Sequence, residues 1–379
     1  MNELMDKFNW VVKDTNAYLT RWKKQTGKKI MGCYPMYVPE EIIHAAGLLP
    51  VTIFAKDEPV TLADQHMHRY VCHVVRGNFD LSLKNRLDYL DGVVFTDFCL
   101  TVRMASSVWM VNNPQLFYHQ IFTPQNMVGD QTPQSLTRQF VRLKKALEDY
   151  TGQEITQDAL SKSIAIYQEN RELLCQLYKL RQANPERFRA RDIAMVVAAG
   201  MVMPKEEHST LLAQLIEQAG ALAPQQAEDK VRVIISGAFC DFPQPGLLNM
   251  IEDTGALVCD DDIFVGRRLF NTPTARDKEP IQALVERYLN DLPDPNKHNP
   301  DNEWVPYLVN LVKETKAQGI VMLVVKYCEA HQFDLPYLSK ELTAAGIPIL
   351  IIETNDSGAT EQMRTRLQAF TEMLISRRD

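Results

Sequence analysis

The sequence predicts an α/β protein with two doubly wound, mainly parallel sheets joined by a helical segment. Three observations support this fold. Short apolar strands alternate with amphipathic helices at the start of the chain, long helical patterns without strands follow, and the alternation then resumes. We therefore expect an N-terminal α/β domain over 1–132, a helical segment over 133–229 and a C-terminal α/β domain over 230–379.

The N-terminal part begins with apolar residues at helical spacing, which predict a helix over 2–26. Pro39 and Gly47 mark the start and the end of a short helix. Beyond them we expect a helix over about 79–90 and strands over 48–54, 93–98 and 116–122. Ligands of such a sheet gather at the carboxyl ends of its parallel strands.

The middle of the chain predicts helices over 135–152, 155–181, 190–203 and 205–220, and then a linker over 222–230. In the C-terminal part, strands are expected over 231–239, 256–260, 319–327 and 347–353. Helices are expected over 245–254, 276–290, 335–345 and 358–377.

Composition limits the possible functions. With 379 residues, 45% of them apolar, the chain can build two or three domain cores. A net charge of −7 disfavours an extended nucleic-acid surface, and no apolar run is long enough to span a membrane. The first residues carry acids that a signal peptide would lack, so we expect a cytoplasmic protein. Seven scattered cysteines indicate reduced thiols or metal ligands instead of a disulfide framework.

Four cysteines are candidate metal ligands. Cys99, Cys240 and Cys328 come directly after predicted strands, and Cys72 lies at the start of a predicted helix. A helix N-terminus stabilises a thiolate, and an iron–sulfur cluster needs three or four thiolates. Most free cysteines are small buried apolar residues, and no CxxC pair occurs, so spacing alone does not choose among the four.

The remaining candidate ligands have simpler interpretations. Cys175 lies in an apolar helical stripe, and we expect it, like Cys33 and Cys259, to be structural. Two groups of polar residues could also hold a metal. The first is His66, His68 and His73, and the second is Asp260, Asp261 and Asp262. Hydrogen bonding, helix capping or solvation is the commoner role of such residues. The sequence has no P-loop, no GxGxxG fingerprint and no HExxH or zinc-type spacing.

Several segments resemble one enzyme family. They are GCYPMYVPEEIIHAAGLLPV, the stretches 72–76 and 99–103, PKEEHSTLL, and YCEAHQFDLPYLSKELTAAGIPILIIETN followed by EQMRTRLQAFTEML. Together they are similar to the 2-hydroxyacyl-CoA dehydratase and benzoyl-CoA reductase family over about residues 28–376. Within that family, YVPEEIIHAAGLLP, SGAFCD and VCDDDIF most resemble the smaller cluster-bearing catalytic subunit of ATP-dependent benzoyl-CoA reductase.

The resemblance implies two Rossmann-like domains and one [4Fe–4S] cluster, held by Cys72, Cys99 and Cys328 with one iron left open. It gives Cys240 no ligand role, which leaves packing or support around the cluster. One departure is Leu100, because many family members have an acidic residue directly after the middle cysteine. This departure disfavours proton transfer at that position and favours the reductase branch.

The implied function is that of a catalytic subunit of a ferredoxin-linked, ATP-dependent benzoyl-CoA reductase in anaerobic aromatic degradation. Such an enzyme converts an aromatic acyl-CoA to a cyclohexadiene-carbonyl-CoA. The implied partners are a larger paralogous cluster-bearing subunit, ATP-hydrolysing activator subunits with their own cluster, and ferredoxin. Two alternatives are a subunit of a 2-hydroxyacyl-CoA dehydratase, which eliminates water by radical chemistry, and a relay subunit whose partner holds the substrate.

Ring reduction also requires protons and a bound acyl-CoA. Four side chains near the presumed ligands could deliver a proton, although structural roles are commoner for such residues: His73, Asp97, Glu329 and His331. Three arginines are candidates for contacts to CoA, although a solvated helix face is the simpler interpretation of the last two: Arg103, Arg364 and Arg366.

Overall fold

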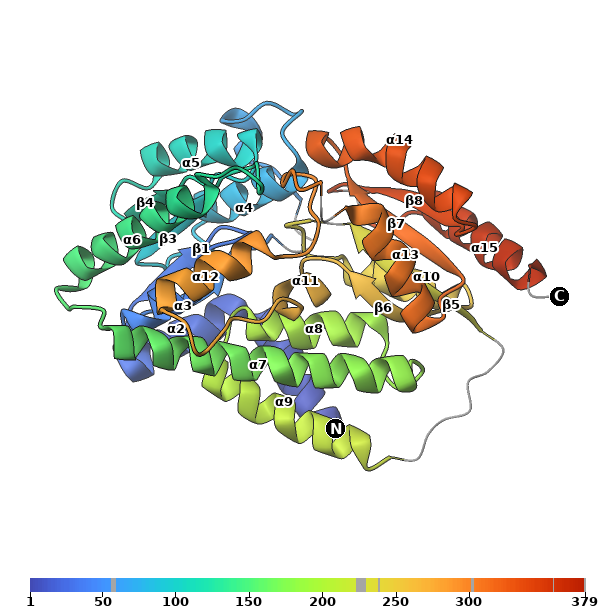
Figure 1. Cartoon of the computed structure of the whole chain (residues 1–379), viewed down its shortest axis with the longest axis horizontal. Helices are drawn as coiled ribbons and strands as arrows, with labels where there is room; N and C mark the ends of the chain where they lie inside the picture. The colour runs from blue at the N-terminus through green and yellow to red at the C-terminus, as the bar shows by residue number, and fades with distance from the viewer. Residues whose placement is uncertain (56–58, 223–229, 238, 301–302, 357, 378–379) are drawn as a thin grey trace.

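The computed structural model describes residues 1–55, 59–222, 230–237, 239–300, 303–356 and 358–377. Two four-stranded, all-parallel sheets lie among many helices (Figure 1). The predicted α/β fold with two Rossmann-like domains is therefore confirmed. The domain limits at 132 and 229 stay a prediction, and most of the linker expected over 222–230 lies outside the described residues.

The first sheet has the strand order β2-β1-β3-β4. Its strands are β1 Ile30–Cys33, β2 Leu49–Thr52, β3 Gly92–Thr96 and β4 Phe117–Ile121. Gly92 faces Phe117, and a Cβ atom added at Gly92 would lie 2.7 Å from the Cβ atom of Phe117. The glycine therefore allows the close approach of β3 and β4 at the start of β3.

The second sheet has the strand order β6-β5-β7-β8. Its strands are β5 Val231–Gly237, β6 Ala256–Asp262, β7 Gly319–Val325 and β8 Ile349–Thr354. Every residue of β7 is buried, as expected for a central parallel strand covered on both faces. In the register of this sheet, Ser236 lies opposite Asp262 on one side and Met322 on the other.

The helices fall into three groups along the chain. The first group is α1 Asn2–Lys13, α2 Thr15–Thr26, α3 Glu40–Ala45, α4 His73–Leu83 and α5 Leu100–Asn112, with a 3₁₀ turn at Ala63–Gln65. The middle group is α6 Thr132–Thr151, α7 Gln157–Ala183, α8 Ala190–Gly200 and α9 Lys205–Gly220. The last group is α10 Pro245–Asp253, α11 Arg267–Phe270, α12 Pro280–Leu289, α13 Trp304–Thr315, α14 Glu329–Ala344 and α15 Glu361–Ser376.

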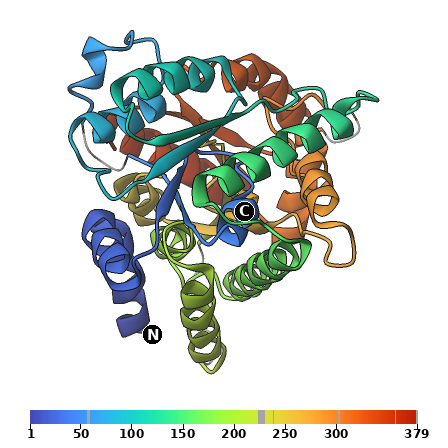
Figure 2. The ribbon, with the colours of Figure 1, turned by 90° about the vertical axis from the view of Figure 1, so that its left-hand side faces the viewer.

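The two halves share a core. One apolar cluster includes Val93 of β3, Met322 of β7 and Leu212 of α9, so it extends between the sheets and the helical group. In Figures 1 and 2, α5 and α14 lie along the upper edge of the molecule, while α1 and α9 lie below the sheets. No described helix combines the length and apolar character needed to cross a membrane.

Several helices differ from the sequence-based prediction. The helix expected over 2–26 is interrupted at Asp14, whose carboxylate accepts the Ala17 N–H and caps α2. Strand β1 and helices α5, α11 and α13 were not predicted, whereas α4 and α14 begin earlier than expected. Cys72, which was expected at the start of a helix, and Cys328 lie at the N-termini of α4 and α14.

Candidate functional site

The three cysteines expected to hold a cluster each occupy the same position relative to a helix. Cys72 is the N-cap of α4, Cys99 that of α5 and Cys328 that of α14. The Cys99 sulfur accepts a hydrogen bond from the backbone N–H of Val102 at 3.4 Å. The free N–H groups and the dipole of a helix N-terminus favour a negatively charged sulfur.

Burial opposes ionisation of these thiols. It raises the pKa of Cys72 to about 12 and the pKa of Cys99 to about 11, and it also raises the pKa of Cys328. Backbone hydrogen bonds act in the other direction, from Val75 on the pKa of Cys72 and from His331 on the pKa of Cys328. Because a metal binds the thiolate, iron would displace a proton from each sulfur.

The structure brings a fourth thiol, that of Cys240, to the same place. Charges on Cys99 and Cys328 add to the rise in the pKa of Cys72, and a charge on Cys72 adds to that of Cys240. Cys72 belongs to the large apolar cluster of the core, and the other three cysteines pack against it. We call this group, Cys72, Cys99, Cys240 and Cys328, the thiol group.

The donor set of the thiol group fits an iron–sulfur cluster. Among the described residues, no three His, Cys, Asp or Glu side chains are placed to hold one metal ion. A four-iron cluster binds each cysteine through a different iron, so its ligand sulfurs lie farther apart than the ligands of a single ion. Cys72, Cys99 and Cys328, at helix N-termini in apolar surroundings, are suitable thiolate ligands for such a cluster.

The other proposed metal ligands have protein partners. The carboxylates of Asp260, Asp261 and Asp262 each form an ion pair with an arginine: Arg267, Arg181 and Arg268, respectively. The exposed His68 ring stacks on Tyr70, and the exposed His66 ring packs against Phe79. These contacts supply each residue with a structural role.

His73, the first residue of α4, pairs with a carboxylate from the second half of the chain. Its Nε2 atom lies 3.2 Å from Oδ2 of Asp241. Burial lowers the pKa of His73, but the charge of Asp241 outweighs burial, and the pKa is raised above its usual value. The charge of Asp241 therefore favours the protonated form of His73, next to Cys72, and the proton-donor role of His73 stays a prediction.

His331 also lies beside the thiol group, but its surroundings favour the neutral ring, whereas those of His73 favour the protonated ring. Burial, together with the positive charge of Arg268, lowers the pKa of this histidine to about 3. Its ring packs against Phe239 and Trp304, and its buried Nε2 atom has no hydrogen-bond partner among the described residues. A neutral imidazole here is a poor acid and instead forms part of the apolar wall.

Asp97 and Arg103 were predicted separately, as a proton donor and a contact to CoA, but they form an ion pair. Nε of Arg103 lies 2.8 Å from Oδ2 of the buried Asp97, and the guanidinium extends into solvent. Glu329, in the first turn of α14, is exposed. The Asp97 carboxylate is therefore fixed by its arginine one residue before Phe98 and two before Cys99.

The two arginines predicted on the last helix also have partners. Nε of Arg364 lies 3.4 Å from Glu361, and Arg366 donates a hydrogen bond to the carbonyl of Ile351 in β8 at 2.7 Å. Both arginines lie on α15, which covers the second sheet, whereas Arg103 lies on α5 beside the first sheet. The predicted CoA residues thus come from two separate parts of the surface.

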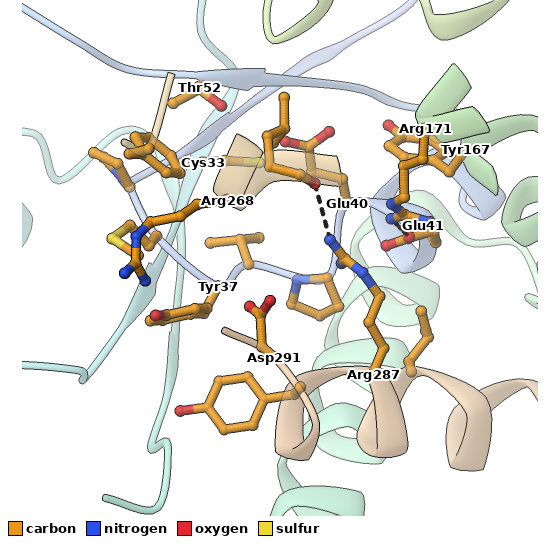
Figure 3. A pocket seen from close by; sticks show the side chains of 18 of the residues that line it. Cys33, Tyr37, Glu40, Glu41, Thr52, Tyr167, Arg171, Arg268, Arg287 and Asp291 are labelled. Carbon is orange, nitrogen blue, oxygen red and sulfur yellow. Dashed lines mark hydrogen bonds and ion pairs between the residues drawn. The ribbon is translucent and has the colours of Figure 1, made fainter. Parts of the chain in front are cut away.

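A charged cavity was not predicted from the sequence, and it is lined by Glu40, Glu41 and Arg171 among other residues (Figure 3). Arg171 pairs with Glu41 on one side of it, and Lys205 lies 3.2 Å from Glu40. Burial raises the pKa of Glu41, but the charge of Arg171 outweighs it and holds the pKa below its usual value. The cavity has a volume of about 90 Å³, which suits a few water molecules.

Two tyrosines connect this cavity to the thiol group. Tyr34 and Tyr37 both line the cavity, and the Tyr37 ring lies 6.1 Å from the ring of Phe98. The pKa of Tyr34 is raised by burial first, and then by charges on Cys72 and other members of the thiol group. The motif GCYPMYVPEE, which carried much of the family resemblance, supplies this wall and was the signal for the cavity.

The fold and the thiol group define a class of protein: a two-domain α/β protein whose two halves contribute cysteines to one buried site. The chain belongs to the family described as 2-hydroxyglutaryl-CoA dehydratase, D-component, whose model matches residues 35–374. The family predicted from the sequence is therefore confirmed.

Three relatives show the range of reactions in this family. The chain is 28% identical to the (R)-phenyllactyl-CoA dehydratase beta subunit of Clostridium sporogenes, over 98% of this chain and 99% of the relative. It is 29% identical to the C subunit of benzoyl-CoA reductase from Thauera aromatica, over 93% of each chain. It is also 29% identical to the beta subunit of (R)-2-hydroxyglutaryl-CoA dehydratase of Acidaminococcus fermentans, over 99% of this chain and 100% of the relative.

These relatives are subunits of enzymes, and identities of 28% and 29% do not separate the dehydratases from the reductase. The chain is thus a member of a family of enzyme subunits that catalyse more than one reaction.

Proposed function

We propose that this chain is an iron–sulfur subunit of a hetero-oligomeric acyl-CoA enzyme, with one [4Fe–4S] cluster bound by Cys72, Cys99 and Cys328. The observation that carries the proposal is the gathering of these three thiols, each at a helix N-terminus, from both halves of the chain. Family membership and the subunit names of the relatives support it.

The chain's own residues would serve the cluster in three ways. The N-termini of α4, α5 and α14 stabilise the thiolates, and the apolar wall around them, including Phe98 and Phe239, excludes water. The pair of His73 and Asp241 ties α4 to the loop after β5 and holds a proton beside the site. When bound, the cluster supplies single-electron transfer.

The specific reaction that we propose is reduction of an aromatic acyl-CoA by a ferredoxin-linked, ATP-dependent complex of the benzoyl-CoA reductase type. The exposed Leu100 after Cys99 supports it, because this position offers no proton-transfer group. A larger paralogous subunit and ATP-hydrolysing activator subunits would complete the complex.

A second candidate is dehydration of a 2-hydroxyacyl-CoA. The description of the family and the names of two of the three relatives above favour it. A reductase consumes ATP with every turnover because each product carries electrons away, whereas a dehydratase recycles its electron and needs ATP only for activation.

The ATP requirement separates the two reactions. The purified complex is supplied with reductant and ATP and is given benzoyl-CoA or a 2-hydroxyacyl-CoA in parallel, and ATP hydrolysis is measured against product. ATP hydrolysed in proportion to a cyclohexadiene-carbonyl-CoA would support the reductase. Many dehydrations after one ATP pulse would contradict it and support the dehydratase.

A further inference from the structure

Arg287 on α12 lines the charged cavity without an ion-pair partner. The other three cations in the cavity wall are paired: Arg171 with Glu41, Lys205 with Glu40 at 3.2 Å, and Arg268 with Asp262 at 2.9 Å. A further carboxylate in the wall, that of Asp291, pairs with Lys297 at 3.6 Å. In the part of the chain that the structure describes, no carboxylate forms an ion pair with Arg287.

The guanidinium of Arg287 also has unused hydrogen-bond donors. Its Nε atom donates to the carbonyl of Thr272 and its Nη2 atom donates to the carbonyl of Leu269, both at 3.1 Å. A guanidinium carries five N–H groups, so both N–H groups of Nη1 lack an acceptor among the described residues. An oxyanion can bind such N–H groups through charge-assisted hydrogen bonds.

The charges around Arg287 favour an additional anion. Its side chain extends from α12 toward Glu41 and Arg171 (Figure 3). Burial first, and then the charge of Arg171, lower the pKa of Arg287. Both arginines act on the single carboxylate of Glu41, and both lower its pKa. A second anion beside the two guanidinium groups would offset their mutual repulsion.

A second group in the cavity wall requires a hydrogen-bond donor. Oε1 of Glu41 accepts a hydrogen bond from Arg171, whereas its Oε2 atom is buried and has no partner among the described residues. Buried acceptors without a partner are rare in folded proteins because they cost free energy. The cavity volume of about 90 Å³ leaves room for a ligand of about four non-hydrogen atoms.

We propose that this cavity binds a small, singly charged oxyanion that also carries a hydroxyl group, and that bicarbonate is the ion that fits it. The carboxylate oxygens of the ion accept hydrogen bonds from Arg287, and its O–H group donates to Oε2 of Glu41. The bound ion thereby connects α12 to α3. The site is independent of the proposed cluster, because none of Cys72, Cys99 and Cys328 lines the cavity.

Thermal unfolding of the full-length chain tests this site in wild type, Arg287→Gln and Arg287→Lys. Potassium bicarbonate replaces potassium chloride at constant pH and ionic strength, and nuclear magnetic resonance of isotope-labelled bicarbonate gives the dissociation constant. Potassium formate is the second probe, since formate has the planar carboxylate but no O–H group. Arg276→Gln is the matched control, because Arg276 is exposed and pairs with Glu172 at 2.8 Å.

For wild type and Arg276→Gln we expect a saturable rise in Tm with bicarbonate and a smaller rise with formate. Arg287→Gln should bind bicarbonate at least about tenfold more weakly, with Arg287→Lys in between, because lysine keeps the charge but not the planar group of donors. A wild-type chain without a saturable response to bicarbonate overturns the inference, even if the Arg287 variants do not fold. Equal affinity of wild type and Arg287→Gln, or of bicarbonate and formate, also overturns it.

Discussion

At the scale of single residues, His208 shows how completely the helical group excludes water. Its Nε2–H donates to the carbonyl of Val196 at 2.9 Å, and its Nδ1 accepts from Asn170 at 2.8 Å. Burial first, and the charge of Lys205 second, lower its pKa to about 3. The neutral ring thus connects α7, α8 and α9, which support the cavity beside the thiol group.

This histidine should make the protein sensitive to mild acid. In the unfolded chain this histidine has a pKa of about 6.5. In the folded chain its pKa is about 3, so the ring stays neutral until the pH falls to about that value. The stabilisation is therefore complete above about pH 6.5 and is lost at about 1.4 kcal/mol per pH unit as the pH falls. We expect His208→Gln to be less stable than wild type at neutral pH but to lose this dependence, as measured by urea unfolding between about pH 5 and pH 7. Parallel pH profiles for the two proteins would contradict this.

Residue-level prediction from the sequence succeeded where the signal was local. A cysteine directly after an apolar strand was expected near the N-terminus of the next helix; this pattern nominated Cys99, Cys240 and Cys328, and Cys99 and Cys328 are indeed helix N-caps. The ion pair of Asp97 and Arg103 was missed, because a separation of six residues across a strand end does not show which side chains face each other. The roles of both residues at the site remain predictions.

At the scale of elements, the strands were more predictable than the helices. Seven of the eight described strands were expected, because parallel strands are continuous apolar runs. The missed one, β1, has only four residues and contains Gly32. Helix α5 was missed because apolar side chains occur on its exposed side as well as its buried side, and this obscures the helical period.

The turn after β5 should be intolerant of change, because it positions Cys240. A Cβ atom at Gly237 would lie 2.1 Å from the carbonyl oxygen of Leu323. Gly237→Ala should therefore lower the free energy of unfolding by several kcal/mol and reduce iron content. Gly346 is the control, since its φ is +77° but no atom lies within 4 Å of a Cβ atom placed at that position.

For Gly346→Ala we expect a loss of only about 1 kcal/mol, from backbone conformation alone. Thermal unfolding and iron analysis of both variants provide the comparison. Equal destabilisation by the two substitutions would mean that the contact with β7 does not constrain the turn.

At the scale of the whole molecule, apolar side chains are exposed around the thiol group. Leu100 on α5 is 69% exposed, Phe333 on α14 is 84% exposed, and Tyr70 before α4 is 70% exposed. Helices α5 and α14 lie along the same edge of the molecule in both views (Figures 1 and 2). An apolar face beside the proposed cluster site suits a partner subunit that would exchange electrons with it.

We expect Phe333→Glu to weaken association with the paralogous subunit by about tenfold or more, because aromatic side chains dominate such interfaces. Trp10→Glu is the control, since Trp10 is 40% exposed on α1, on the other side of the molecule. Affinity purification of the tagged chain from native extract, followed by mass spectrometry, reports the partner. Loss of the partner from the Trp10 variant alone would place the interface elsewhere.

The two-domain architecture was predictable, because it follows from strand–helix alternation. The meeting of four cysteines from distant segments was not, since it depends on how the two sheets pack together. Family resemblance selected three of the four candidates as ligands and left Cys240 a packing or supporting role; the folded chain brings Cys240 to the others.

The central claim is that Cys72, Cys99 and Cys328 hold an iron–sulfur cluster. Iron and sulfide analysis of the anaerobically purified chain tests it most directly. Wild type and Cys175→Ser should contain about four irons per chain and give a reduced-cluster resonance signal. Cys99→Ser should lose most of that iron and the signal. Equal iron content in wild type and Cys99→Ser would contradict the account.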